Sequence, residues 1–306
     1  MKYIIASSVG TDDVYQSDGT FMKAVPGGAG FYALCGIRLY SNDVVITGGV
    51  GPSYLKMHGT WYESNKVSTK GLVVRCEDAV TTVDYRAQDD RTDSPSIGLW
   101  EFRKRDPSIK EVSSFIDQET KGVYTFRHFD KDFLESLIEE KKKHNFNLMW
   151  EISEDACTEE NRSGIEALLP YIDIFSINRH ELCLLYGTDN EEEAIDRLLK
   201  TQCPLSYVRR GKDGAVVLDG KQKTKFYSLP CTNRKVVDTT GCGNASSGAF
   251  LYGISEGYSP ELSSAIGAVA ASYVLAQFGP PLVFNDEISK VAFEEANNLH
   301  KENMKK

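Results

Sequence analysis

The chain has 306 residues, of which 41% are hydrophobic and 26% are charged, a balance typical of globular proteins in water. Its formal net charge of −9, from 35 basic and 44 acidic residues, argues against a nucleic-acid surface, which would need a basic face. No apolar run approaches the roughly 20 residues that span a bilayer, and the apolar stretch in MKYIIASSVG is too short for a signal-peptide core. We therefore expect a cytoplasmic protein without nucleic-acid or membrane partners, built as one large domain or two smaller ones.

Seven cysteines are scattered along the chain, and no two of them show the C-x-x-C spacing that is common in zinc sites. Secreted disulfide-stabilised domains are shorter and denser in cysteine, so reduced thiols in a cytoplasm are the simplest interpretation. Only Cys242 lies within a motif. It is either a thiol activated at a helix N-terminus or a small residue that fills a turn.

The first 51 residues predict two strands and a helix. Tyr3 to Ser7 is expected to form the first strand. Gly27-Gly28-Ala29-Gly30 then leads into FYALCGIRLY, in which the apolar residues fall loosely at helical spacing. The run VVITGGVG at 44–51 predicts a buried strand that ends in a glycine turn.

From residue 130 the alternation of helices and strands becomes clearer. DKDFLESLIEEKKKHN has aspartates in its first turn and lysines in its last, which matches the helix dipole. The predicted elements that follow are a strand FNLMWEI, a helix around 159–169, a strand DIFSIN, a helix from Arg179, a helix EEEAIDRLLK opened by a capping box at 190–193, a strand LSYVRR, and a hairpin at 214–229 that turns at Asp219-Gly220. Repeated β–α units with nearly continuous apolar strands predict a mostly parallel sheet covered by helices on both faces.

One region departs from this alternation. Residues 67–90 are rich in strand formers without a clear helix between them, and residues 84–107 are crowded with charge. Segments of about 11–24 and 67–103 are therefore expected to form a small β lid over the carboxyl edge of the sheet. The alternative is a solvated loop excursion. Because exposed lid strands could pair between subunits, a homodimer through the lid is also expected.

Residues 236–250, VVDTTGCGNASSGAF, join a strand end to a helix rich in small residues. The glycines of Asp238-Thr-Thr-Gly-Cys-Gly243 allow backbone N–H groups to approach a ligand, and a helix N-terminus adds positive potential. Ligands of open α/β sheets bind at the carboxyl ends of strands, so this run predicts an anion site suited to a transferred phosphoryl group. The chain has neither a G-x-x-x-x-G-K-[ST] motif nor a G-x-G-x-x-G after its first strand, which leaves P-loop and Rossmann interpretations unsupported.

Taken together, the motifs resemble those of the ribokinase-like, or pfkB-type, carbohydrate kinases over about residues 3–285. The family signature D-T-T-G-A-G-D is similar to residues 238–244, with Cys in place of Ala and Asn in place of the last Asp. The glycine motif resembles residues 27–30, the N-x-x-E element resembles residues 178–181, and the strand and G-x-x-G hairpin resemble residues 207–214. The resemblance implies a single domain over 1–306, a ribokinase-like three-layer α/β/α sandwich with a mostly parallel central sheet and a small β lid.

The resemblance also implies a role for each matching residue. The implied groups are a substrate site of Asp13, Gly27 and Gly28, a nucleotide site of Asn178, Arg209, Gly211 and Gly214, an anion hole of Gly241, Cys242 and Gly243, and Glu181 on Mg²⁺ through water. On the residues alone, the alternatives are that Asp13 is a turn residue, that Asn178 and Glu181 form a helix cap, and that 211–214 is an ordinary hairpin entry. Arg209 stands where the family usually has Thr, and it either reaches phosphate or caps its strand in solvent.

The departures from the family pattern concern the chemistry. Asn244 occupies the position of the family's general base, but an amide cannot accept the proton of an acceptor hydroxyl. Tyr32 replaces the usual asparagine of the glycine motif. The resemblance implies a kinase that uses ATP and Mg²⁺ on a hydroxyl of a sugar or sugar-like molecule. The alternative is a weakly active or inactive relative that binds nucleotide or sugar in a regulatory role. Restoring the carboxylate with Asn244→Asp is expected to raise turnover.

Overall fold

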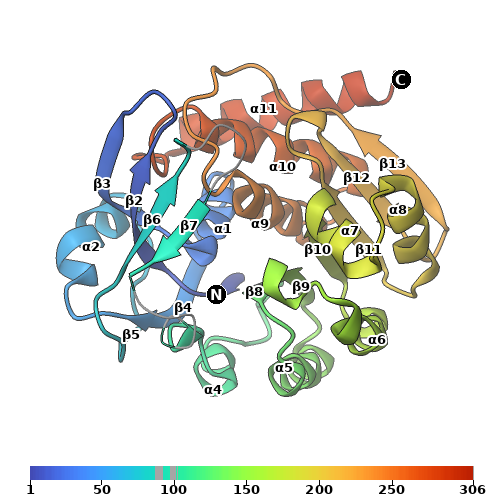
Figure 1. Ribbon diagram of the computed structural model, residues 1–306, viewed down its shortest axis with the longest axis horizontal. Coiled ribbons are helices and arrows are strands. Elements are labelled where there is room, and N and C mark those ends of the chain that lie inside the picture. Colours follow the sequence, from blue (N-terminus) through green and yellow to red (C-terminus); the bar gives the residue numbers. More distant parts are fainter. Residues whose placement is uncertain (87–91, 97–100, 102, 306) are drawn as a thin grey trace.

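The computed structural model describes residues 1–86, 92–96, 101 and 103–305. Figure 1 shows a large twisted sheet with helices on both of its faces and a second, smaller sheet beside it. Within this described part of the chain, no helix combines the length and the apolar character that crossing a membrane requires.

In the described residues the large sheet has nine strands, in the order β13-β12-β11-β10-β9-β8-β1-β4-β5. Neighbouring strands from β11 to β5 are parallel, and β12 and β13 are added to β11 as an antiparallel hairpin. Their bounds are β1 Tyr3–Ala6, β4 Val44–Val50, β5 Leu72–Val74, β8 Gly122–Arg127, β9 Asn147–Ile152, β10 Ile174–Asn178, β11 Leu205–Arg209, β12 Ala215–Asp219 and β13 Thr224–Ser228. The parallel strands therefore present their carboxyl ends at one common edge, where ligands of such sheets bind.

Two layers of helices enclose the sheet, as the sequence predicted (Figure 1). The core on one face includes α1 Ala29–Arg38, α2 Tyr54–Ser64, α9 Cys242–Ser255, α10 Pro260–Leu275 and α11 Asp286–Asn303. The core on the other face includes α4 Ile109–Ser113, α5 Lys131–His144, α6 Glu159–Leu168, α7 Arg179–Tyr186 and α8 Glu191–Lys200. A mostly parallel sheet needs both faces covered because its strands are apolar on both sides.

The smaller sheet contains, among the described residues, β2 Gly10–Tyr15, β3 Phe21–Gly27, β6 Val80–Asp84 and β7 Thr92–Pro95. The outer pairs β2–β3 and β6–β7 are antiparallel, and the central pair β2–β6 is parallel. Both predicted lid segments contribute to it, so the strand-rich interpretation is confirmed there. Residues 72–74 of the second segment, however, pair with β4 in the large sheet. Residues 87–91, 97–100 and 102 of that segment lie outside the described residues.

Local sequence signals begin and end the helices where they were predicted. The Asp130 side chain accepts the amide of Phe133 at the start of α5, which ends at Asn145 in the left-handed conformation. Asn190 caps α8 through the amide of Glu193, although the reciprocal half of a capping box is not formed there among the described residues. The predicted strands and hairpin from Tyr3 to Ser228 are confirmed to within about two residues at each end.

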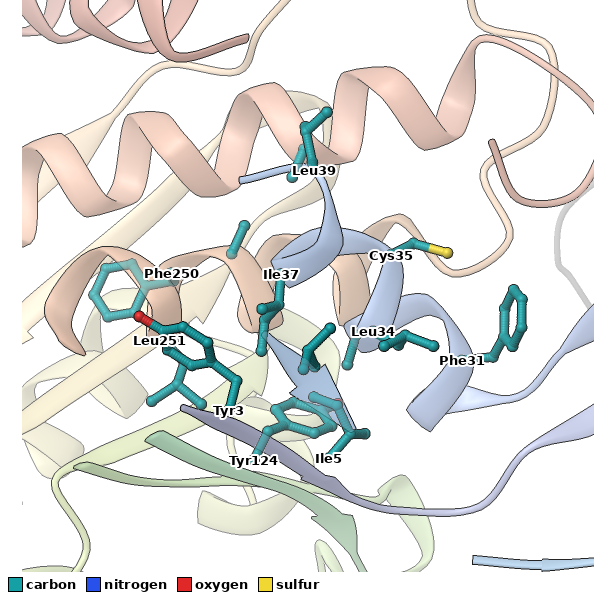
Figure 2. Close-up of a cluster of buried hydrophobic side chains, with 14 of the residues drawn as sticks. Tyr3, Ile5, Phe31, Leu34, Cys35, Ile37, Leu39, Tyr124, Phe250 and Leu251 are labelled. Atoms are coloured by element: carbon teal, nitrogen blue, oxygen red, sulfur yellow. The ribbon is translucent and has the colours of Figure 1, made fainter. Parts of the chain in front are cut away.

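The hydrophobic core fixes α1 and α9 on the same face of the sheet. Figure 2 shows Ile37 of α1 facing Phe250 and Leu251 of α9, Leu34 farther along α1, and the strand side chains Tyr3, Ile5 and Tyr124 beneath them, all in one core cluster. On the same helix, Phe250 stacks on Tyr207 of β11 with ring centroids 4.3 Å apart, and the Tyr207 hydroxyl hydrogen bonds to Ser246 at 2.6 Å. These contacts hold α9 at a fixed position relative to the end of β11.

Candidate active site

The helix α9 begins at the carboxyl edge of the sheet. Its N-cap, Gly241, has φ of 75°, and a Cβ there would lie 1.9 Å from the ring of Tyr32, so this position requires glycine. The amide of Cys242 donates to the carbonyl of Thr239 at 3.3 Å. The amides of Gly243 and Asn244 have no carbonyl partner within the helix because they belong to its first turn. The backbone donors that this turn leaves for a ligand are therefore those of Gly243 and Asn244 more than that of Cys242.

Asn244 is hydrogen bonded to a buried carboxylate, Glu151, on strand β9 of the large sheet. Its Nδ2 donates to Oε1 of Glu151 at 2.9 Å and lies 3.4 Å from the hydroxyl of Tyr124. The Tyr124 hydroxyl donates to the other oxygen of Glu151 at 2.8 Å. Burial and the adjacent Glu151 charge raise the pKa of Tyr124, which stays a neutral donor. An amide at position 244 thus supplies the hydrogen that this carboxylate accepts.

Arg209 completes the group from the end of β11. Its Nη2 lies 3.0 Å from Oε1 of Glu151 and 3.5 Å from Oε2 of Glu181. Burial alone would lower the pKa of Arg209, but the two carboxylates outweigh it and the pKa is raised. A Cβ at Gly243 would stand 2.3 Å from Nη1, so the guanidinium lies directly against the first turn of α9. The sequence left open whether this arginine faces solvent, and the structure leaves only 13% of its side chain exposed.

Asn178 and Glu181 form a capping box at the start of α7. Oδ1 of Asn178 accepts the amide of Glu181, and Oε2 of Glu181 accepts the amide of Asn178, both at 2.8 Å. Burial raises the pKa of Glu181 to about 7, against the lowering effect of Arg209 and the Asn178 amide. The helix-cap interpretation of this pair is therefore correct as far as the free protein goes, and it does not conflict with a further role.

A metal ion at this site would depend on few protein ligands. The described residues contain no group of three or more His, Cys, Asp or Glu side chains that could hold a metal. Mg²⁺ is, however, commonly bound by one or two carboxylates together with water and substrate phosphates. Glu181 contacts Arg209, and Arg209 lies against the first turn of α9. Glu181 is therefore placed to hold such an ion indirectly, through a metal-bound water molecule.

A cavity of about 550 Å³ lies beside this group. It brings together residues from both predicted halves of a nucleotide site, namely Arg209, Gly211, Gly214, Cys242 and Gly243. Its remaining walls include apolar residues of the loop after β13 and of α10, among them Leu229, Val236, Ala268, Ala271 and Leu275. A concave, partly apolar space of this size with a few polar groups at one end is typical of a small-molecule site.

The predicted substrate residues lie on the other side of Tyr32. Gly27 ends β3 and Gly28 is the N-cap of α1. The predicted Asp13 accepts the amide of Ala24 at 2.7 Å, at an irregular position of the β2–β3 pair. Its neighbour Asp12 is buried, and its carboxylate lies where a Cβ of Gly27 would stand. The structure thus brings Asp12, and not Asp13, to Gly27.

Tyr32 separates the two regions. Its side chain is buried, its ring lies on Gly241, and within the described residues its hydroxyl has no hydrogen-bond partner. Burial, followed by the charges of Asp12 and Asp238, raises its pKa. A buried hydroxyl without a partner is rare in proteins and marks a position where a ligand could supply one.

Sequence reasoning missed Glu151, Tyr124 and Asp12. Glu151 carries a recognisable signal, since it is the one charged residue in the apolar strand segment FNLMWEI. A buried charge near the carboxyl end of a parallel strand is rarely tolerated without a partner and therefore points to a site. Asp12 and Asp13 are adjacent, and only the strand register distinguishes them.

The profile of the pfkB family carbohydrate kinases matches residues 12–283 of the chain. Among curated proteins, an ATP-dependent 6-phosphofructokinase from Thermoanaerobacterium thermosaccharolyticum is 28% identical over 162 residues. The matched segment covers 50% of this chain and spans about half of that relative, 48% of its length.

Solved structures share the fold over nearly the whole chain. The crystal structure of adenosine kinase from Sinorhizobium meliloti has a TM-score of 0.78 at 21% identity and covers 96% of this chain and 99% of its own. A fructokinase from Vibrio cholerae O395, in a form with fructose, ADP and calcium ion bound, has a TM-score of 0.75 at 18% identity, covering 96% and 99%. The ribokinase-like fold predicted from the motifs is confirmed.

Proposed function

Because the chain belongs to the pfkB family of carbohydrate kinases, we propose that it transfers a phosphoryl group from ATP to a hydroxyl of a sugar or sugar-like small molecule. The observation that carries the proposal is the cavity that the 211–214 turn and the first turn of α9 line together. Two similar proteins support the choice of donor. One is named as an ATP-dependent kinase, and the other holds ADP and a calcium ion together with fructose.

In this proposal the nucleotide base and ribose occupy the apolar part of the cavity, and the phosphates lie toward Gly243 and Arg209. The first-turn amides and positive end of α9 would stabilise the negative charge of the transferred group. Mg²⁺, with Glu181 as a ligand through water, would neutralise charge on the phosphates. Asn178 contributes by holding Glu181 in place through the capping box.

The acceptor would lie between the small sheet and the start of α9, near Asp12, Gly27 and Gly28. We propose that the small sheet acts as a lid over this acceptor and that the chain works as one unit. The edges of that sheet in the described residues are β3 and β7, and a homodimer through them remains part of the proposal.

A second candidate function is binding without efficient turnover, in a regulatory role. The observation that favours it is the hydrogen bond that commits Asn244 to Glu151, since no base stands at the family's usual position. A positioned general base contributes about 10²–10⁴-fold to a rate, whereas phosphoryl transfer depends mainly on positioning and electrostatics. The first candidate therefore survives the loss of the base as a slower kinase.

The test is ATP consumption measured over a panel of sugars, nucleosides and sugar phosphates, with and without Mg²⁺. We expect at least one acceptor to stimulate ATP use in a Mg²⁺-dependent way. Folded protein that binds ATP but is stimulated by no member of the panel would favour the regulatory candidate. Folded protein that shows no thermal stabilisation at millimolar ATP would overturn the kinase and any nucleotide-binding regulatory role, because ligand binding to the native state raises the melting temperature, and would leave only a sugar-binding regulatory role.

The metal assignment is tested separately with Glu181→Gln. Glutamine can still accept the amide of Asn178, so the cap of α7 is preserved while the charge is removed. We expect the ATP-induced thermal shift to lose most of its dependence on Mg²⁺. An unchanged Mg²⁺ dependence would show that the metal is bound without Glu181.

A further inference from the structure

The position of Arg209 is electrostatically unusual. Its Nη1 lies against Gly243 in the first turn of α9, where the helix dipole is positive. A cation at this end of a helix is unfavourable unless negative charge is also present. The carboxylates that pair with Arg209, Glu151 and Glu181, both contact the other nitrogen, Nη2.

Two nitrogens of the guanidinium are also incompletely satisfied as hydrogen-bond donors among the described residues. Within the described residues, Nε and Nη2 of Arg209 form no hydrogen bond of normal geometry, although Nη2 is close to both carboxylates. The side chain is 13% exposed and lines the 550 Å³ cavity next to Gly243. Nε and Nη2 themselves are buried, so it is the exposed remainder of the side chain that borders this space, in which an anion could be held.

Glu151 and Asn244 form a hydrogen-bonded pair that holds the guanidinium of Arg209. Oε1 of Glu151 faces both Nη2 of Arg209 and Nδ2 of Asn244, and Tyr124 holds its second oxygen. A carboxylate at position 244 would add a second negative charge within hydrogen-bond distance of Glu151. It would compete with Glu151 for the guanidinium. The amide of Asn244 therefore belongs with Glu151 and Arg209 as one unit.

We propose that Arg209 contacts the terminal phosphoryl group of a nucleoside triphosphate in the cavity, and that Glu151 and Asn244 are positioning residues that hold its guanidinium over the first turn of α9. This inference rests on the proposed nucleotide site. It assigns to a side chain of β11 the fixed positive charge that phosphoryl transfer requires near the transferred group. It also gives Asn244 a role that does not involve removal of a proton.

The proposal predicts how the protein distinguishes nucleotides by phosphate number. A charge-assisted hydrogen bond to the terminal phosphoryl group favours ATP over ADP, whereas a purely structural ion pair has no such effect. The experiment measures dissociation constants of ATP, ADP and AMP by calorimetry, in Mg²⁺ and in EDTA. The variants are Arg209→Lys, Glu151→Gln, and the double variant Arg209→Met with Glu151→Gln, which removes both charges and avoids leaving Glu151 unpaired.

The adjacent Arg210 supplies the matched control. It pairs with Glu191 and is not among the described residues that line the cavity. We expect Arg209→Lys to weaken ATP by about 10- to 100-fold while ADP and AMP change little, so that the preference for ATP over ADP collapses. Arg210→Lys should leave the preference unchanged. The double variant should resemble Arg209→Lys in selectivity while remaining folded.

The outcomes separate this inference from the proposed function. If the wild type binds none of the three nucleotides, the nucleotide site itself is wrong. If it binds them and Arg209→Lys keeps the wild-type preference for ATP over ADP, the role of Arg209 is overturned. Glu151→Gln should reduce the preference by less than Arg209→Lys does. A preference that rises in Glu151→Gln would show that Glu151 only neutralises Arg209 and does not position it.

Discussion

The side-chain amide of Asn244 donates to the carboxylate of Glu151, with Nδ2 and Oε1 2.9 Å apart. This contact gives a physical reason for an amide at position 244, where the resemblance implied a general base. The Glu151 carboxylate is buried, pairs with Arg209 and accepts a hydrogen bond from Tyr124. A carboxylate at position 244 would therefore place its acceptor oxygens against those of Glu151, where the amide of Asn244 now offers a donor. The structure therefore changes the expectation for restoring the base.

Asn244→Asp alone is expected to reduce stability and to give no gain in turnover. Two carboxylates at this separation cannot both ionise readily, so the variant either takes up a proton or moves one side chain. We expect a loss of about 1–3 kcal/mol in the free energy of unfolding, measured by urea denaturation at pH 7.5.

Adding Glu151→Gln tests whether repulsion between the two carboxylates causes this loss of stability. In the double variant of Asn244→Asp with Glu151→Gln, the amide introduced at position 151 can donate to the carboxylate introduced at position 244, which restores one donor and one acceptor. This variant should recover stability relative to Asn244→Asp, and it is the one in which a base could raise turnover by up to about 10²–10⁴-fold. If Asn244→Asp by itself is as stable as the wild type and faster, the contact with Glu151 does not determine the residue at 244.

Asp12 and Asp13 are expected to have separable roles. Asp12→Asn should weaken binding of any accepted sugar by about 10-fold or more and leave ATP binding intact, because its carboxylate lies at Gly27. Asp13→Asn should mainly destabilise the β2–β3 pair, since Asp13 accepts the amide of Ala24. Calorimetry with the acceptor and thermal melting of both variants provide the comparison. The reverse pattern would return the substrate role to Asp13.

Tyr32→Phe should leave the free protein as stable as the wild type or more stable. It removes a buried hydroxyl that has no partner among the described residues, and such a group costs about 1–3 kcal/mol. Acceptor affinity should fall if the hydroxyl donates to the bound ligand. Tyr124→Phe is the control, because that hydroxyl is hydrogen bonded to Glu151 and its loss should destabilise the protein. Clear destabilisation by Tyr32→Phe would contradict the absence of a partner.

His58 should make stability depend on pH in the acidic range. Burial lowers its pKa from 6.5 to about 4, and its Nε2 lies 2.9 Å from Oγ1 of Thr11 in the small sheet. Because the folded state binds the proton less readily than the unfolded state, the contribution of His58 is complete above pH 6.5 and is lost as pH falls through 4.

The measurement compares wild type with His58→Gln by urea denaturation at about pH 7.5, 6 and 5. The stability difference between the two proteins should shrink steadily toward acid, because glutamine does not titrate. Other titrating groups act equally in both proteins and cancel in the difference. A difference that is constant over this range would mean that His58 is protonated in both states or in neither.

The sequence by itself determined the order of the elements and the fold, and it named some of the residues that border the cavity. These features depend on signals that are short along the chain, such as helix caps, apolar strand runs and glycine turns. Gly211 and Gly214 follow closely after the end of β11 in the chain. Cys242 and Gly243 are the first residues of α9, a helix that the small residues after them predict. Such local signals survive in any context that buries the same apolar faces.

Only the tertiary structure decided which polar groups meet. Asn244 and Glu151 are 93 residues apart, and they touch because β9 lies two strands from β11 and beneath the start of α9. The choice between Asp12 and Asp13 depends on the register of β2 against β3, which shifts between Asp12 and Val14. A shift of one residue exchanges the two faces of a strand, and no local pattern of adjacent aspartates records it. Packing between distant segments therefore decides which charged side chains meet at the site. The reason is that a buried ion pair such as Arg209 with Glu151 forms only where the fold removes both partners from water together.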